Sequence, residues 1–115
     1  MYKDWPEMAE ELNPLVAALR TAQPDVMKGF GQMAQAALKT QALDTKTKEL
    51  IALGISVAVR CEACITYHAK AAVKAGASDA EIAEAMGMAI YMGAGPSVMY
   101  AAQALEAAEQ WRQKG

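Results

Sequence analysis

The chain has 115 residues, of which 54% are hydrophobic and 21% are charged, and its formal net charge is −2. This length predicts one domain, residues 1–115, and the composition is that of a globular protein rather than a disordered one. A slight negative charge provides neither a basic surface for nucleic acid nor a polybasic footprint for membranes. We therefore expect no nucleic-acid partner and no membrane partner.

The predicted elements are all helices, because the sequence lacks strand-like alternation and is rich in alanine. Asn13 before Pro14 is a favourable N-cap and indicates the start of the first helix, after a turn. Ser78 and Glu81 have the spacing of a capping box, and Pro96 opens the last helix. In chain order, the expected helices cover approximately residues 14–21, 24–37, 45–60, 61–75, 79–92 and 96–112.

Two of these helices are more apolar than a small domain can easily bury. Residues 50–59 are almost wholly apolar, and Glu84 is the only charged residue between positions 82 and 92. A helix that is apolar on all sides is expected to be buried on all sides. The uncharged stretch 85–105 has the length of a membrane span, but Gly93-Ala94-Gly95-Pro96 interrupts it. We therefore expect a homo-oligomer rather than a membrane protein.

The most informative motif is Glu49-x11-Cys61-x2-Cys64-x3-His68, which contains both cysteines and the single histidine of the chain. On a helix, positions i, i+3 and i+7 share one face, so the two thiols and the imidazole are expected to form one stripe. The first residues, Met1–Pro6, lack the apolar region of a signal peptide, which favours a cytoplasmic location. In that compartment, a Cys-x2-Cys pair is more often catalytic or metal-binding than structural.

This stripe has the groups required for dithiol chemistry on a weak O–O or S–S bond. The helix N-terminus favours a thiolate at Cys61, whereas proximity to His68 favours one at Cys64. We assign the nucleophile to Cys64, because cleavage of a peroxide also needs a proton donor and His68 is nearest to it. Cys61 would then resolve the sulfenic acid, and Glu49 would orient the imidazole.

Other interpretations of the same residues remain open. The histidine can be structural, and the cysteines can be inert core thiols. Glu49 can simply be a first-turn carboxylate that the helix dipole stabilises. The four side chains Glu49, Cys61, Cys64 and His68 could also bind zinc. However, three ligands at i, i+3 and i+7 on one helix surround a single ion poorly. We expect no metal and no cofactor.

The motif resembles the signature of the AhpD-like alkylhydroperoxidase family, within the carboxymuconolactone decarboxylase-like superfamily. The resemblance covers residues 48–107 most clearly, including Gly76-Ala77-Ser78 and Gly93-Ala94-Gly95-Pro96, and extends over about 14–106. It implies an AhpD-like all-α fold of five to six helices that assembles as a trimer or hexamer. It also implies a peroxidase that passes electrons from a dithiol donor to an organic hydroperoxide.

By position, the resemblance makes Cys64 the peroxidatic thiol and Cys61 its resolving partner, with Glu49 and His68 as the proton relay. One position departs from the family pattern: some members have a histidine between the cysteines, where this chain has Glu62 and Ala63. A carboxylate there can raise the pKa of the thiols by like-charge repulsion.

We therefore predict a thiol-dependent hydroperoxide reductase. The alternatives are a disulfide oxidoreductase or redox sensor with little peroxidase activity, a superfamily member of other activity, and a helical assembly protein with vestigial cysteines. Because muconolactone decarboxylases of the superfamily work without a Cys-x2-Cys pair, the two thiols argue against that activity.

Overall fold

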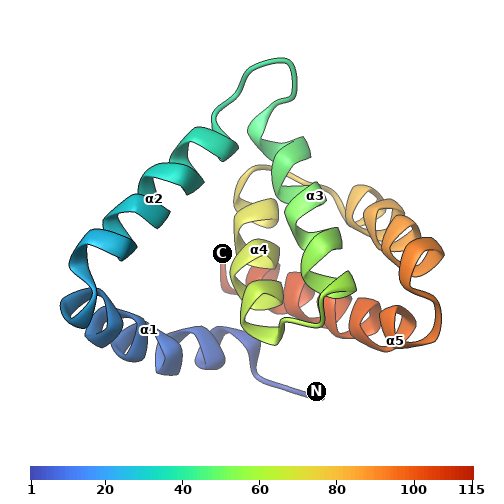
Figure 1. Cartoon of the computed structure of the whole chain (residues 1–115). Coiled ribbons are helices and arrows are strands. Elements are labelled where there is room, and N and C mark those ends of the chain that lie inside the picture. Colours follow the sequence, from blue (N-terminus) through green and yellow to red (C-terminus); the bar gives the residue numbers. More distant parts are fainter.

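The computed structural model describes residues 1–115 as five α-helices with no strands (Figure 1), which confirms the predicted all-α fold. Helices α3, α4 and α5 pack against one another and contain most of the core, whereas α1 and α2 extend around one side. No helix combines the length and the apolarity needed to cross a membrane. The helices are α1 (Trp5–Ala22), α2 (Pro24–Leu38), α3 (Thr45–Ala58), α4 (Glu62–Lys74) and α5 (Asp79–Lys114).

The first helix begins earlier than the sequence indicated. Asp4 caps α1 by accepting a hydrogen bond from a first-turn N–H, and Pro6 occupies the first turn, where a missing N–H costs nothing. The helix then continues through Pro14, which lies in its interior. The prediction that Asn13 caps a short helix was wrong. The side-chain oxygen of Asn13 instead accepts a hydrogen bond from the hydroxyl of Tyr67 on α4.

The predicted interruption near residue 95 is present as a kink within α5. Ala94 has φ 54° and ψ −138°, which is not helical, and Pro96 follows in the first turn of the second segment. The two segments of α5 therefore run in different directions (Figure 1). At the start of α5, Ser78 and Glu81 form the predicted capping box, with both reciprocal hydrogen bonds present.

Helix α2 contributes nothing to the core of its own chain, because none of its residues is buried. Val26, Phe30 and Met33 lie at helical spacing on one side, and the Phe30 side chain is 58% exposed. In Figure 1, α2 stands away from the bundle and is joined to it through α1 and the loop before α3.

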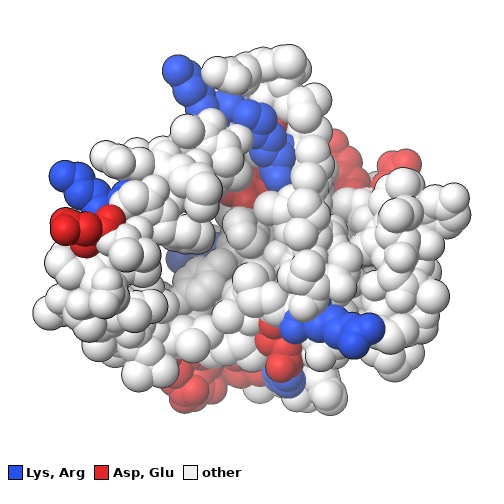
Figure 2. Space-filling view, viewed as in Figure 1, with Lys and Arg blue, Asp and Glu red and all other residues white.

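The first segment of α5 is also more exposed than expected. Ile82, Met86 and Ala89 are buried, but Met88, Tyr91 and Met92 are exposed, so the prediction of burial on every side does not hold for a single chain. Met88 and Met92 lie beside α3, where they line an apolar groove of about 400 Å³ together with Ile51 and Ile55. Figure 2 shows that most of this face of the molecule carries no charge.

Candidate functional site

A tight turn between α3 and α4 positions the first cysteine. Arg60 adopts φ 60°, in the left-handed region that residues other than glycine rarely occupy. This turn lets the backbone N–H of Cys61 donate to the carbonyl of Ser56 at 3.0 Å. Cys61 is therefore the N-cap of α4 rather than its first helical residue.

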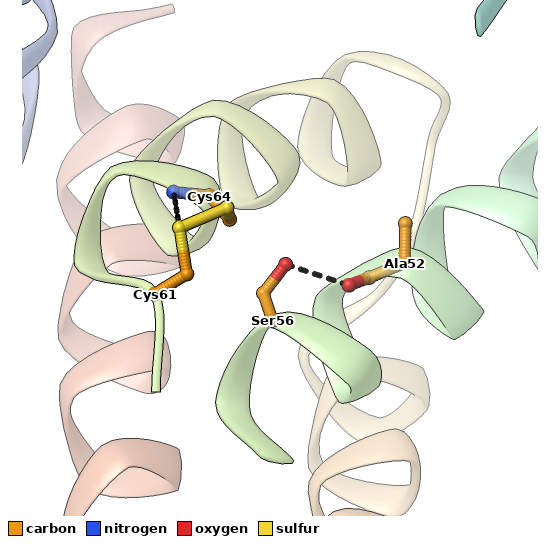
Figure 3. The surroundings of a disulfide bond; sticks show 4 residues. All are labelled: Ala52, Ser56, Cys61 and Cys64. Carbon is orange, nitrogen blue, oxygen red and sulfur yellow. Dashed lines mark hydrogen bonds between the residues drawn. A yellow bond between two sulfur atoms is a disulfide. The ribbon is translucent and has the colours of Figure 1, made fainter. Parts of the chain in front are cut away.

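Cys61 and Cys64 form a disulfide in the first turn of α4 (Figure 3). The Sγ atom of Cys61 accepts a hydrogen bond from the backbone N–H of Cys64 at 3.1 Å, as an N-cap side chain does. When the disulfide is reduced, the same N–H and the positive end of the helix dipole favour a thiolate at Cys61. Both residues are partly exposed, so reagents in solution can reach them.

The imidazole of His68 faces α3 and contacts Glu49. Nδ1 of His68 lies 2.8 Å from Oε1 of Glu49, and the Glu49 side chain is only 7% exposed. If the carboxylate accepts this hydrogen bond, Nδ1 carries the proton and Nε2 of a neutral imidazole keeps its lone pair. Nε2 makes no hydrogen bond to the protein. It therefore remains able to exchange a proton with a thiol or a substrate.

Ser56 is a site residue that the sequence analysis did not select. It is buried on α3, and Figure 3 shows its side chain on the side of α3 that faces the disulfide. Its hydroxyl donates to the carbonyl of Ala52 at 2.7 Å. The available signal was a serine within the apolar run 50–59, since a buried hydroxyl needs a hydrogen-bond partner.

Cys61 and Cys64 lie at the first turn of α4, His68 lies one turn later, and Glu49 contacts His68 from the N-terminal half of α3. No group of three or more His, Cys, Asp or Glu side chains is arranged to hold a metal ion. The four main surface hollows lie elsewhere, and none is lined by a motif residue.

The fold and the site define an all-α protein with a disulfide-forming Cys-x2-Cys pair at the start of a helix. The chain belongs to the carboxymuconolactone decarboxylase family, whose sequence model matches residues 24–107.

Relatives with sequence similarity over most of the chain are known. An uncharacterized protein of Cupriavidus necator is 37% identical over 95 residues, which cover 83% of this chain and 84% of that protein. An apo crystal structure of a carboxymuconolactone decarboxylase family protein from Legionella pneumophila has a TM-score of 0.91 and 46% identity. The match covers 94% of this chain and 96% of that one.

A second solved structure is a family protein from Thermotoga maritima, for which an involvement in the antioxidative response has been suggested. It is 36% identical, with a TM-score of 0.71, over 76% of this chain and 91% of that one. Identity and structural similarity at these levels agree with the assignment from the family model.

Proposed function

We propose that the protein is a thiol-dependent hydroperoxide reductase that cycles between a dithiol and the Cys61–Cys64 disulfide. The observation that carries the proposal is the disulfide in the first turn of α4, one turn from an imidazole that a buried carboxylate holds. The suggested antioxidative role of the Thermotoga maritima relative supports the same chemistry.

The reaction begins with the reduced protein. The thiolate of Cys64 attacks the terminal oxygen of the hydroperoxide, the O–O bond breaks, and the leaving alkoxide takes a proton from His68. Cys64 is then a sulfenic acid, and the sulfur of Cys61 attacks it and releases water. Two electrons pass from the dithiol to the peroxide, and the products are an alcohol, water and the disulfide. An external dithiol donor must then reduce the disulfide.

Within this cycle, Glu49 keeps the proton of His68 on Nδ1 and stabilises the imidazolium when Nε2 is protonated. The positioning supports this role, since α3 presents Glu49 from a buried position and α4 presents His68 at a partly exposed one. A peroxide can therefore approach the imidazole from solvent, while the carboxylate remains fixed.

The test is a thiol titration of reduced protein before and after one equivalent of cumene hydroperoxide. We expect both thiols to disappear and the mass to correspond to an internal disulfide. The Cys64→Ser variant should keep its remaining thiol, whereas Cys61→Ser should accumulate a sulfenic acid at Cys64 that dimedone traps. Unchanged thiols in the wild-type protein would refute the peroxidase function.

Disulfide exchange with a protein partner is the second candidate function. It is favoured by the lack of a main surface hollow beside the disulfide, since a small substrate is usually bound in a concave site. In the same titration, a protein of this kind would keep its thiols with peroxide but would lose them rapidly with a disulfide substrate.

We also propose that the protein is a homo-oligomer, with a trimer or a hexamer as the expected assembly. The exposed apolar side of α2 and the apolar groove between α3 and α5 support this proposal. Apolar surface of this extent on a small chain is typical of an interface between subunits.

A further inference from the structure

The segment before α1 is held against α5 by a set of hydrogen bonds. The backbone N–H of Lys3 lies 3.4 Å from the carboxylate of Glu106, and its carbonyl accepts from the Gln110 side chain at 2.7 Å. Gln110 also accepts from the N–H of Trp5, whose side chain is fully buried. Lys3 therefore has a defined backbone position, although it lies outside the helices.

From this position, the Lys3 side chain reaches the start of α4. Its ammonium forms an ion pair with the carboxylate of Glu62, the residue that follows the first cysteine. The ammonium also lies 5.6 Å from the ring centre of Trp5 and 5.5 Å from that of Tyr2, within the range of cation–π contacts. Figure 2 shows acidic and basic side chains together near the end of the molecule where α3 meets α4.

We propose that Lys3 is a positioning residue of the redox site: it neutralises Glu62 and so prevents this carboxylate from repelling the thiolate of the reduced dithiol. This inference rests on the proposed dithiol chemistry. Glu62 lies in the first turn of α4, where a carboxylate favours the helix but disfavours a second negative charge beside it. With the ion pair, the Glu62 carboxylate can still stabilise the helix start, while the ammonium of Lys3 offsets its repulsion of the thiolate.

Other charged groups lie around α4. Arg60 precedes the cysteines, Glu49 faces His68 from α3, and Glu106 on α5 contacts the backbone of the N-terminal segment. All of these are kept in the variants below, so a change between variants reports on Lys3 and Glu62 alone.

The test measures the pKa of the reactive thiol in reduced protein from the pH dependence of its alkylation by iodoacetamide. Lys3→Met should raise this pKa by roughly half a unit, given charges several ångströms apart at a partly exposed site. Alkylation at pH 7 should then slow by about twofold, because the thiolate fraction falls by about threefold while its nucleophilicity rises slightly. Lys3→Arg should retain the wild-type pKa.

The double variant Lys3→Met/Glu62→Gln should return the pKa to nearly the wild-type value. A structural loosening of the N-terminal segment would not be reversed in this way, so the double variant separates the two explanations. Lys46→Met is the matched control, since Lys46 pairs with Glu81 at 2.8 Å near the opposite end of α3. This control should not change the thiol pKa.

An unchanged pKa in Lys3→Met, or a raised pKa that persists in the double variant, would overturn the proposal. Circular dichroism establishes that each variant is folded, and Lys3→Gln replaces Lys3→Met if the latter loses helicity. The measurement uses no peroxide, so a protein that is inert to hydroperoxides can still support or refute the role of Lys3.

Discussion

Nδ1 of His68 and Oε1 of Glu49 lie 2.8 Å apart and join α4 to α3 through a buried carboxylate. The contact connects residues 19 positions apart in the sequence. It fixes the ring orientation of the imidazole and leaves Nε2 without a protein partner, as a proton relay to the neighbouring thiol requires.

Replacing Glu49 by Gln should slow the formation of the disulfide by peroxide by roughly 10-fold to 100-fold. The amide cannot stabilise an imidazolium, and it can donate to Nδ1 and so favour the wrong tautomer. Stopped-flow measurement of thiol loss with cumene hydroperoxide checks this prediction. Glu84→Gln, an exposed carboxylate on α5, is the control and should react at the wild-type rate. Equal rates for all three proteins would contradict the proposed relay.

Replacing Phe30 by Glu on the exposed side of α2 should dissociate the oligomer without unfolding the chain. The side chain makes no contribution to the core of its own chain, so a charge there should disrupt only contacts with another copy. Sedimentation should give a monomer of 12.2 kDa with wild-type helicity. Gln32→Glu, on another side of the same helix, should keep the wild-type assembly. A wild-type protein that sediments as a monomer would refute the oligomer proposal.

Replacing Thr66 by Val should destabilise the fold by about 3 kcal/mol. The buried hydroxyl of Thr66 donates to the carbonyl of Trp5 at 2.7 Å and accepts from the indole N–H of Trp111 at 3.1 Å. Valine would leave both groups without partners inside the core. Thr66→Ser keeps the hydroxyl and should cost only about 1 kcal/mol for the lost methyl group. Equal midpoints for the two variants in urea unfolding would show that these hydrogen bonds do not stabilise the fold.

Replacing Glu106 by Gln should lower Tm by a few degrees at pH 7, with a smaller effect in acid. Burial raises the pKa of Glu106, but hydrogen bonds from the Tyr2 N–H, the Trp5 indole and the Lys3 N–H lower it by more. The pKa of Glu106 therefore lies below its ordinary value of 4.5. A lowered pKa in the folded state stabilises the fold above pH 4.5, and this stabilisation is lost as the pH falls through the folded-state value.

Tm curves of wild type and Glu106→Gln should therefore converge at acid pH. Glu109→Gln, an exposed carboxylate on the same helix, is the control and should follow the wild-type curve throughout. A difference between wild type and Glu106→Gln that is independent of pH would show that the ionised carboxylate is not the stabilising group.

Local sequence signals determined much of the secondary structure. Ser78 and Glu81 predicted a helix start because the reciprocal capping bonds involve only neighbouring residues, and Pro96 marked the second segment of α5 for a similar reason. The Asn13 signal failed, since tertiary contact with Tyr67 competed for the same side chain and α1 began at Trp5 instead.

The spacing of Cys61, Cys64 and His68 predicted one helical stripe, because helix geometry fixes which positions share a face. In the structure Cys61 is not helical but caps α4. The ion pair of Lys3 with Glu62 and the position of Ser56 beside the disulfide could not be predicted in the same way. They depend on how the N-terminal segment and α3 pack around α4.

The sequence by itself determined most of the helices, the Cys-x2-Cys motif and the excess of apolar surface, since each depends on residue type and short-range spacing. Only the tertiary structure decided which apolar side chains remain exposed, that Cys61 caps α4, and that Lys3 reaches Glu62. These features depend on contacts between segments that are distant in the sequence. Chain packing selects such contacts through burial and hydrogen bonding, which no local pattern encodes.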